Sequence, residues 1–267
     1  MKKIISFLLL IATLCTFASC ADDGSDLDYI KKKGELIVGI TDFEPMDFKE
    51  NADADWTGFD AELARLVGEK LGVKVVFQEI NWKTKETELA GKTIDCIWNG
   101  LTWDSDRAAN MSMSDYYMVN RQVIVVRGGD EAKVADAVSA KISVAVESGS
   151  AGEEIVNEKF KAATLIEKDT QIDSLTELVA GTVDAAVIDF TMANYLINKD
   201  GSDFSGLVIV DGAVEVADEY YSIAFRKGSD VTAEVNKYLK ELRDSGIIAS
   251  LAKKYGLESA LYTGEAK

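Results

Sequence analysis

The chain has 267 residues, 47% of them hydrophobic and 28% charged, so it can bury one large core or two smaller ones. Its 46 acidic residues outnumber its 29 basic residues, and the resulting net charge of −17 repels nucleic acid. With no histidine and only three cysteines, the chain lacks the usual ligands of zinc, copper or iron, and histidine-based catalysis is excluded. We therefore expect no metal site and no cofactor.

The first twenty residues have the composition of a secretion signal. A basic start at residues 2–3 precedes an apolar run at residues 4–11, and two small residues stand directly before Cys20. We therefore predict a signal peptide over residues 1–19. Residues 17–20, Phe-Ala-Ser-Cys, resemble the bacterial lipobox, which implies cleavage before Cys20 and its lipidation. Ordinary cleavage after residue 18, leaving Cys20 unmodified, is the alternative.

Residues 20–33 are predicted to be the lipidated cysteine and a flexible tether, because residues 22–28 are polar, acidic and poor in apolar side chains. No later run approaches the ~20 apolar residues of a membrane span, so any attachment is by lipid alone. Cys96 then has no partner cysteine, and we predict that it is a small core residue.

Strand-like and helix-like segments alternate along the rest of the chain. The predicted strands of a first unit are residues 36–40, 73–77 and 94–98, with helices at 59–71 and 84–90. The predicted strands of a second unit are residues 142–146, 164–166 and 184–188, with helices at 151–160, 172–180 and 191–197. Such alternation predicts two α/β units, each a parallel sheet with helices on its faces.

Two further strand-like stretches, residues 122–126 and 220–225, flank the second unit and are suited to carry the chain between two lobes. Helical stripes at residues 231–242 and 247–255 then return the chain to the first lobe. The predicted domains are residues 34–122 plus 221–267 for lobe 1 and residues 123–220 for lobe 2.

Polar residues follow the predicted strands, at the positions where open α/β sheets bind ligands. Arg107 offers a planar fork of donors that matches a carboxylate, although it is equally suited to a surface salt bridge. Asp189 ends an apolar strand and needs a partner such as an ammonium there, unless it caps the next helix. Ser150 and Glu153 form a capping-box pattern beside two glycines, where backbone amides can face an anion.

A series of motifs resembles the polar amino-acid-binding proteins of bacterial ABC importers, the family 3 type of periplasmic or extracellular solute-binding protein. The motifs are residues 42–48 (Asp-Phe-Glu-Pro-Met-Asp-Phe), 58–60, 80–82, 94–95, 98–102, Arg107, 120–122, 148–150 and 184–189. The resemblance runs from about Gly34 to Gly256. It implies a type II periplasmic-binding-protein fold, in which two lobes with mostly parallel sheets flanked by helices hold the ligand in a cleft.

The resemblance also implies roles for individual residues. The ligand α-carboxylate is held by Arg107, Thr102 and the amides near Ser150 and Ala151; the α-ammonium is held by Asp42, Asp189 and the Gly100 carbonyl. The side-chain pocket is walled by Phe43 and Trp82, with Leu101 and Glu147 also in the ligand-binding set and Phe48, Trp98 and Asn99 in support. Ala151 departs from the family, which often has a hydroxyl there. Glu147 favours a cationic or amide side chain if it faces the ligand, and has no such effect if it points to solvent.

The implied protein is not an enzyme but the extracytoplasmic substrate-binding subunit of an ABC transporter, which closes its hinge on a free amino acid. Its implied partners are that amino acid, the permease subunits and the bacterial cell membrane, through a lipid at Cys20. A ligand-sensing protein and a dehydratase-like enzyme on the same fold are the alternatives.

Overall fold

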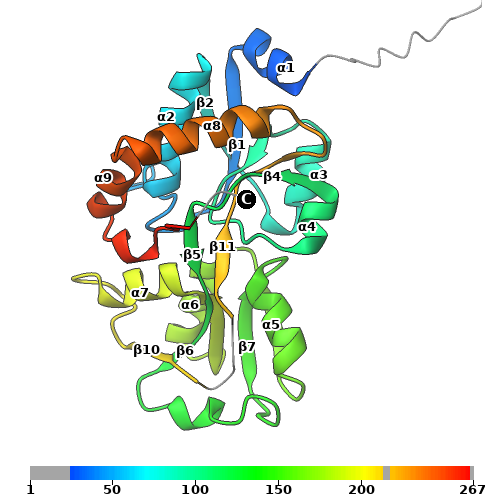
Figure 1. The fold of residues 1–267 in the computed structure, drawn as a ribbon. Helices are drawn as coiled ribbons and strands as arrows, with labels where there is room; N and C mark the ends of the chain where they lie inside the picture. Colours follow the sequence, from blue (N-terminus) through cyan, green and yellow to red (C-terminus); the bar gives the residue numbers. More distant parts are fainter. Residues whose placement is uncertain (1–24, 213–216, 265–267) are drawn as a thin grey trace, which may run out of the picture.

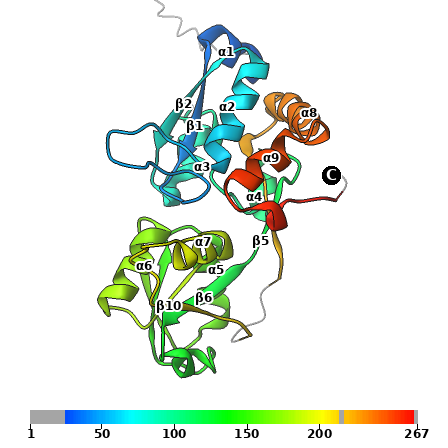
Figure 2. The ribbon, with the colours of Figure 1, turned by 90° about the vertical axis from the view of Figure 1, so that its left-hand side faces the viewer.

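The computed structural model describes residues 25–212 and 217–264. The predicted signal peptide and Cys20 lie outside these described residues. Two α/β lobes lie one above the other and are joined at one side by extended segments (Figures 1 and 2). Within the described ranges, no helix has the length and apolar character needed to cross a membrane.

Lobe 1 is built on a five-stranded sheet in the order β2-β1-β3-β12-β4. Its strands are β1 (Glu35–Ile40), β2 (Lys74–Glu79), β3 (Cys96–Ile97), β4 (Met111–Met113) and β12 (Ala224–Arg226). Its helices are α1 (Asp26–Lys33), α2 (Phe59–Leu71), α3 (Lys85–Ala90), α4 (Ser105–Asn110), α8 (Val231–Asp244) and α9 (Ile247–Lys254). β1 runs parallel to β2 and β3, whereas β12 runs antiparallel to β3 and β4.

Lobe 2 is built on a second five-stranded sheet, in the order β10-β6-β9-β7-β8. Its strands are β6 (Gln122–Arg127), β7 (Ser143–Glu147), β8 (Thr164–Lys168), β9 (Ala185–Asp189) and β10 (Leu207–Val210). Its helices are α5 (Ala151–Lys159), α6 (Gln171–Ala180) and α7 (Phe190–Asn198). β7 runs parallel to both of its neighbours, and β6 runs antiparallel to β9 and β10. Both lobes are thus α/β units, as the sequence predicts, but neither sheet is the parallel sheet expected from the alternation, because β12 in lobe 1 and β6 in lobe 2 pair antiparallel with both of their neighbours.

Two crossing strands carry the chain between the lobes. β5 (Met118–Asn120) and β11 (Glu219–Tyr221) pair antiparallel, with Glu219 opposite Asn120 and Tyr221 opposite Met118. In Figure 1 both run vertically from the upper lobe to the lower one. We propose that the lobes divide at these two crossings, close to the predicted boundaries, with Gln122 in lobe 2 and residues 26–33 in lobe 1.

Apolar residues at helical spacing place α2 against the lobe 1 sheet. Phe59, Leu63 and Val67 are four residues apart, share one face of the helix and are fully buried. The helix ends at Gly72, whose φ of 77° is the left-handed conformation that favours glycine. Cys96 is buried in the same core and forms no disulfide among the described residues, consistent with its predicted core position.

Two predictions from the sequence are wrong. The tether does not extend to residue 33, because residues 26–33 form α1, which Ser25 caps and Ile30 anchors with 0% exposure. Asp26 also accepts hydrogen bonds of 3.0 Å from Arg226 Nε, and this pair fixes the helix on lobe 1. The strand predicted over residues 220–225 is two strands, β11 in the crossing and β12 in the lobe 1 sheet.

Candidate ligand-binding site

A cavity lies between the two lobes, and residues of both lobes line it. Most of its lining residues stand at or just after the carboxyl ends of strands, where ligands bind in open α/β sheets. The lining residues are Phe43, Trp82, Asn99, Gly100, Thr102, Arg107, Glu147, Ser150, Ala151, Gln171 and Asp189. The structure therefore brings most of the predicted ligand-binding residues together in one place.

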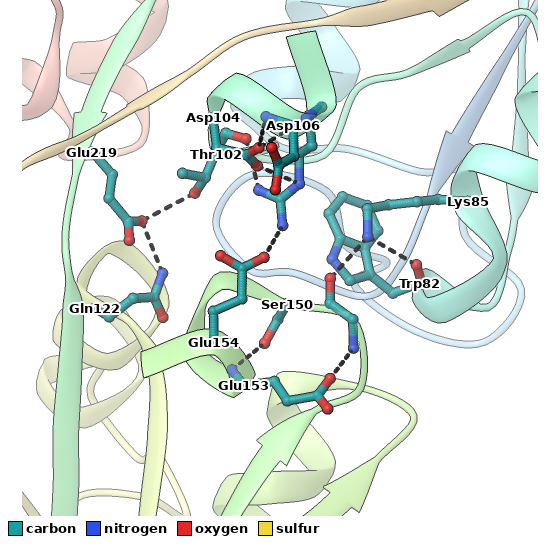
Figure 3. A network of polar contacts seen from close by, with 12 residues as sticks. Trp82, Lys85, Thr102, Asp104, Asp106, Gln122, Ser150, Glu153, Glu154 and Glu219 are labelled. Carbon is teal, nitrogen blue, oxygen red and sulfur yellow. Dashed lines mark hydrogen bonds and ion pairs between the residues drawn. The ribbon is translucent and has the colours of Figure 1, made fainter. Parts of the chain in front are cut away.

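Arg107 forms one charged corner of the cavity, on lobe 1. Asp104 caps α4 by accepting a 2.8 Å hydrogen bond from the Arg107 amide, and its other oxygen lies 2.9 Å from Arg107 Nε. Arg107 Nη1 donates to the Thr102 carbonyl at 2.8 Å, and Nη2 lies 3.2 Å from Glu154 Oε1 on lobe 2 (Figure 3). Arg107 is 6% exposed, and its guanidinium is held in one orientation by its own loop. A fork of donors fixed in this way suits a carboxylate.

The loop before α5 brings backbone groups to the opposite side of the cavity. Ser150 Oγ accepts from the Glu153 amide at 3.2 Å, while Glu153 Oε2 accepts from the Gly149 amide at 2.6 Å. Gly149 has a φ of 77°, and a Cβ there would lie 3.0 Å from Lys83 Cα of lobe 1. Lys85 Nζ donates across to the Gly149 carbonyl at 2.8 Å. Glycine thus allows the loop to approach lobe 1 closely.

Asp189 forms the second charged corner, at the end of β9, and is 5% exposed. Its Oδ1 accepts hydrogen bonds from Asn120 Nδ2, from Gln122 Nε2 at 3.1 Å and from the Tyr221 hydroxyl at 2.8 Å. Its Oδ2 accepts from Gln171 Nε2, and Gln171 Oε1 accepts from the Asp189 amide at 2.9 Å. Burial raises the pKa of Asp189, although these hydrogen bonds act to lower it. The second lone pair of Oδ2 is where a ligand ammonium can bind.

Asp189 occupies the N-cap position of α7, but its side chain does not cap that helix. Its side chain makes no capping hydrogen bond to α7. Asn120 Oδ1 caps that helix instead, accepting from the Thr191 amide at 3.2 Å and from the Thr191 hydroxyl at 3.0 Å. The alternative role of Asp189 as a helix cap is therefore wrong, and its carboxylate remains available to the cavity.

Glu147 brings a further carboxyl group to the cavity, at the end of β7. It is 2% exposed, so the orientation toward solvent that the sequence left open is wrong. Its Oε1 is buried without a hydrogen-bond partner among the described residues. Burial, and then the negative charge of Asp189, raise the pKa of Glu147 to about 8. An unpaired buried carboxyl oxygen is a site for a donor from the ligand.

Two aromatic rings wall the cavity. Phe43 meets Tyr221 edge-on, with ring centroids 6.3 Å apart, and a Cβ at Gly100 would lie 2.4 Å from Phe43 Cε1. Gly100 also has a φ of 57°, so both its backbone and its lack of a side chain are needed there. Trp82 carries Lys85 Nζ 4.8 Å from its ring centroid.

Four predicted residues are not among the lining residues: Asp42, Phe48, Leu101 and Trp98. Leu101 and Trp98 are fully buried in the hydrophobic core behind the cavity. Phe48 packs edge-on against Tyr255, with centroids 6.4 Å apart. Asp42 is partly buried, and burial and then the charge of Glu44 raise its pKa to about 6.

Gln171 lines the cavity, and the sequence analysis missed it. It is the first residue of α6, three positions after β8 ends at Lys168. The predicted strand ends at Ile166 and the predicted helix begins at Ile172, so Gln171 lies between two predicted elements. Searching every residue between a strand and the next helix would have found it.

Fold and site together define a two-lobed α/β binding protein with oppositely charged groups facing one cavity. Residues 36–258 match the family of bacterial extracellular solute-binding proteins, family 3, and the chain belongs to that family. The arginine-binding extracellular protein ArtP of Bacillus subtilis (strain 168) is 32% identical over 263 residues, which are 97% of this chain and 98% of that protein.

Two solved structures are also similar. One is the ancestral amino-acid-binding protein AncCDT-1, described as a precursor of cyclohexadienyl dehydratase; it is 30% identical with a TM-score of 0.78, and the match covers 86% of this chain and 99% of that one. The other is an ancestral arginine-binding protein bound to arginine, 30% identical with a TM-score of 0.74, covering 83% of this chain and 98% of that one. The predicted type II periplasmic-binding-protein fold is confirmed.

Proposed function

We propose that the protein captures a free amino acid with a cationic side chain, of the arginine class, in the cavity between its lobes. The protein is the extracytoplasmic substrate-binding subunit of an amino-acid ABC transporter. The observation that carries the ligand class is the set of three ionisable groups around one cavity: Arg107 on lobe 1, and Asp189 and Glu147 on lobe 2. Two of them match the ends of a zwitterion, and the third is an acid left for the side chain.

The ligand carboxylate binds the Arg107 fork, the Thr102 hydroxyl and the amides that begin α5, while the ammonium binds Asp189. Because Arg107 and Asp189 stand on different lobes, a zwitterion contacts both only when the lobes are together. The zwitterion therefore binds the closed arrangement of the lobes more tightly than the open one, and this difference in affinity drives closure. The free amino acid thus acts as the bridge between the two halves of the site.

The side-chain pocket supports a cationic ligand. Glu147 presents its unpaired Oε1, and the aromatic ring of Trp82, which attracts cations to its face, lines the same cavity. ArtP is named for arginine binding, and one of the similar structures holds arginine. These relatives support the same ligand class for this chain.

Catalysis on the same fold is the second candidate, because Glu147 is a buried acid with a pKa of about 8 and one structural relative is described as the precursor of a dehydratase. A carboxyl group protonated at neutral pH can act as a general acid. Incubation with a prephenate-like substrate tests this candidate: product formation by the wild type that is lost in Glu147→Gln would support an enzyme.

The lipid anchor at Cys20 is a separate part of the proposal, supported by the lipobox-like residues 17–20. We expect Cys20→Ala to move the protein from the membrane fraction to the medium or periplasm without changing amino-acid affinity. Equal membrane retention of the variant would contradict lipid anchoring.

A thermal-shift screen of the twenty amino acids, with cystine and ornithine added, tests the ligand class. We expect arginine, lysine and ornithine to stabilise the protein most, by about 2.7 kcal/mol when the ligand is at 100 times its dissociation constant. Glu147→Gln keeps the shape of the pocket but removes its acid, so it should lower the affinity for arginine relative to glutamine. An unchanged ligand order in Glu147→Gln would show that Glu147 does not select the side chain.

A further inference from the structure

Glu219 joins the cavity wall to both crossings between the lobes. Its Oε2 accepts hydrogen bonds from Thr102 Oγ1 at 3.0 Å, from Gln122 Nε2 at 3.0 Å and from Asn120 Nδ2 at 3.4 Å. Thr102 belongs to lobe 1, Gln122 begins the lobe 2 sheet, and Asn120 ends the other crossing strand. Figure 3 shows Glu219 on its crossing strand, with its carboxylate between Thr102 and Gln122.

The backbone fixes this arrangement. Thr102 forms an antiparallel bridge with Tyr221, and the Trp103 amide donates to the Tyr220 carbonyl at 2.8 Å. On its other edge, Glu219 is paired with Asn120 in the β5–β11 ribbon. The strand pairing therefore brings Thr102 and Glu219 close enough for their side chains to meet.

The Thr102 hydroxyl carries one proton and can donate only one hydrogen bond, although its oxygen can accept another. In this structure it donates to Glu219. Thr102 also lines the cavity, where the proposed function makes it a donor to the ligand carboxylate. Glu219 and the ligand thus compete for the same hydroxyl proton.

We propose that Glu219 is a positioning residue that controls the direction of the Thr102 hydroxyl, an inference that rests on the proposed function. As a carboxylate, Glu219 accepts from Thr102 and withholds that donor from the ligand. As a carboxylic acid, Glu219 donates its proton to Thr102 Oγ1, and the hydroxyl then donates to the ligand carboxylate. Binding of the amino acid is therefore coupled to uptake of one proton from solvent onto Glu219.

The electrostatics of the crossing are suited to this exchange near neutral pH. Burial, and then the negative charge of Asp189 at the end of β9, raise the pKa of Glu219 to about 7, while the donors Gln122, Thr102 and Asn120 lower it. Besides Asp189, the titratable groups nearby are Tyr221 on the same strand and, in the cavity, Glu147 and Arg107. The acid form of Glu219 dominates below pH 7, so its contribution to affinity is present there and is lost as pH rises.

The test must separate Glu219 from Glu147, because Glu147 ionises at higher pH and then favours a cationic ligand. We therefore compare Glu147→Gln with the double variant Glu147→Gln, Glu219→Gln, by calorimetric titration with L-arginine and L-glutamine at pH 6 and pH 8. The amide introduced by Glu219→Gln does not titrate, so its hydrogen bond with Thr102 cannot change between pH 6 and pH 8.

For Glu147→Gln we expect about tenfold weaker binding at pH 8 than at pH 6, because only the protonated tenth of the molecules is then competent. Titrations in buffers of different ionisation enthalpy should show uptake approaching one proton per ligand at pH 8. The double variant should bind with the same affinity at both pH values and take up no proton. Thr102→Val, placed in the Glu147→Gln background, should also lose the pH dependence, with weaker binding at both pH values.

If Glu147→Gln and the double variant have the same pH profile and the same proton uptake, the proposed role of Glu219 is overturned. A pH dependence that persists in Thr102→Val, in the Glu147→Gln background, would also overturn this role. This second test remains available if the Glu219 variant does not fold. If wild-type protein binds no amino acid in the thermal-shift screen, the proposed function fails, and the inference fails with it.

Discussion

The two charged corners of the cavity are built in different ways. Arg107 is held by Asp104 and by the Thr102 carbonyl, which are three and five residues away in the sequence. Asp189 is held by side chains 69, 67, 32 and 18 residues away, and three of these four, Asn120, Gln122 and Tyr221, lie on or directly beside the crossings. The first corner is complete within one loop of lobe 1. The second exists only when lobe 2 and both crossings are assembled.

This difference predicts which substitutions affect closure of the two lobes as well as ligand affinity. A change at the Arg107 corner removes a contact with the ligand and leaves the rest of the site in place. A change at the Asp189 corner also disturbs the side chains that fix the crossings. Variants at the two corners should therefore differ in their effect on closure, and not only in affinity.

Asp189→Asn should have the largest effect. It removes the charge that faces the ligand ammonium, and loss of one partner from a buried charge pair costs about 2–5 kcal/mol, or at least about thirtyfold in affinity. The variant should also contract little in small-angle scattering at ligand concentrations that close the wild type. Retained thermal stability without ligand is the control. Closure at wild-type ligand concentrations would place the ammonium site elsewhere.

Arg107→Lys should come next, with a loss of about 1.5–3 kcal/mol that is similar for every amino acid that binds. A lysine keeps the positive charge but cannot present the fork of donors, and it leaves Asp104 and the Thr102 carbonyl with weaker partners. Calorimetry with three ligands checks the uniformity. A change in ligand order without a general loss would mean that Arg107 contacts the side chain and not the carboxylate.

Gln171→Met should weaken binding by about 1–2 kcal/mol, because the Asp189 carboxylate loses one donor and the Asp189 amide loses its acceptor. Methionine has a similar length and keeps the cavity filled. The loss should again be shared by all ligands, since the ammonium is common to them. An effect confined to cationic ligands in parallel titrations would instead make Gln171 a contact of the ligand side chain.

The contrast between the corners also explains what the sequence could predict. Residues that follow a strand directly, such as Asp189 and Glu147, were found because apolar runs mark the strand ends. Asn120 and Glu219 could not be given their roles, because these depend on the pairing of β5 with β11, a register between residues 99 positions apart.

The same reasoning accounts for the errors in the fold. The α1 helix has one fully buried side chain, Ile30, and is fixed by the distant Arg226, so its own residues carry little apolar signal. The strand predicted over residues 220–225 is largely aromatic and aliphatic and therefore gave no sign that the chain leaves one sheet and joins another within it.

Glu154→Gln should have the smallest effect, and its sign is informative. The Glu154 carboxylate lies 3.2 Å from Arg107 Nη2 across the cavity, but the Glu154 side chain is 65% exposed. An exposed pair of this kind contributes about 0–1 kcal/mol and is screened by salt. Because Glu154 occupies a donor that the ligand carboxylate uses, its loss should raise the affinity for every amino acid by about two- to fivefold at low ionic strength.

The effect of Glu154→Gln should disappear in high salt, and Glu158→Gln provides the matched control. Glu158 lies on the same helix, is 66% exposed and pairs with its neighbour Lys159, so its substitution should leave affinity unchanged. Titrations of both variants at low and high salt separate the outcomes. If Glu154→Gln binds more weakly than the wild type, the pair with Arg107 acts as a clasp that holds the lobes together, and the lobe 1 corner depends on closure after all.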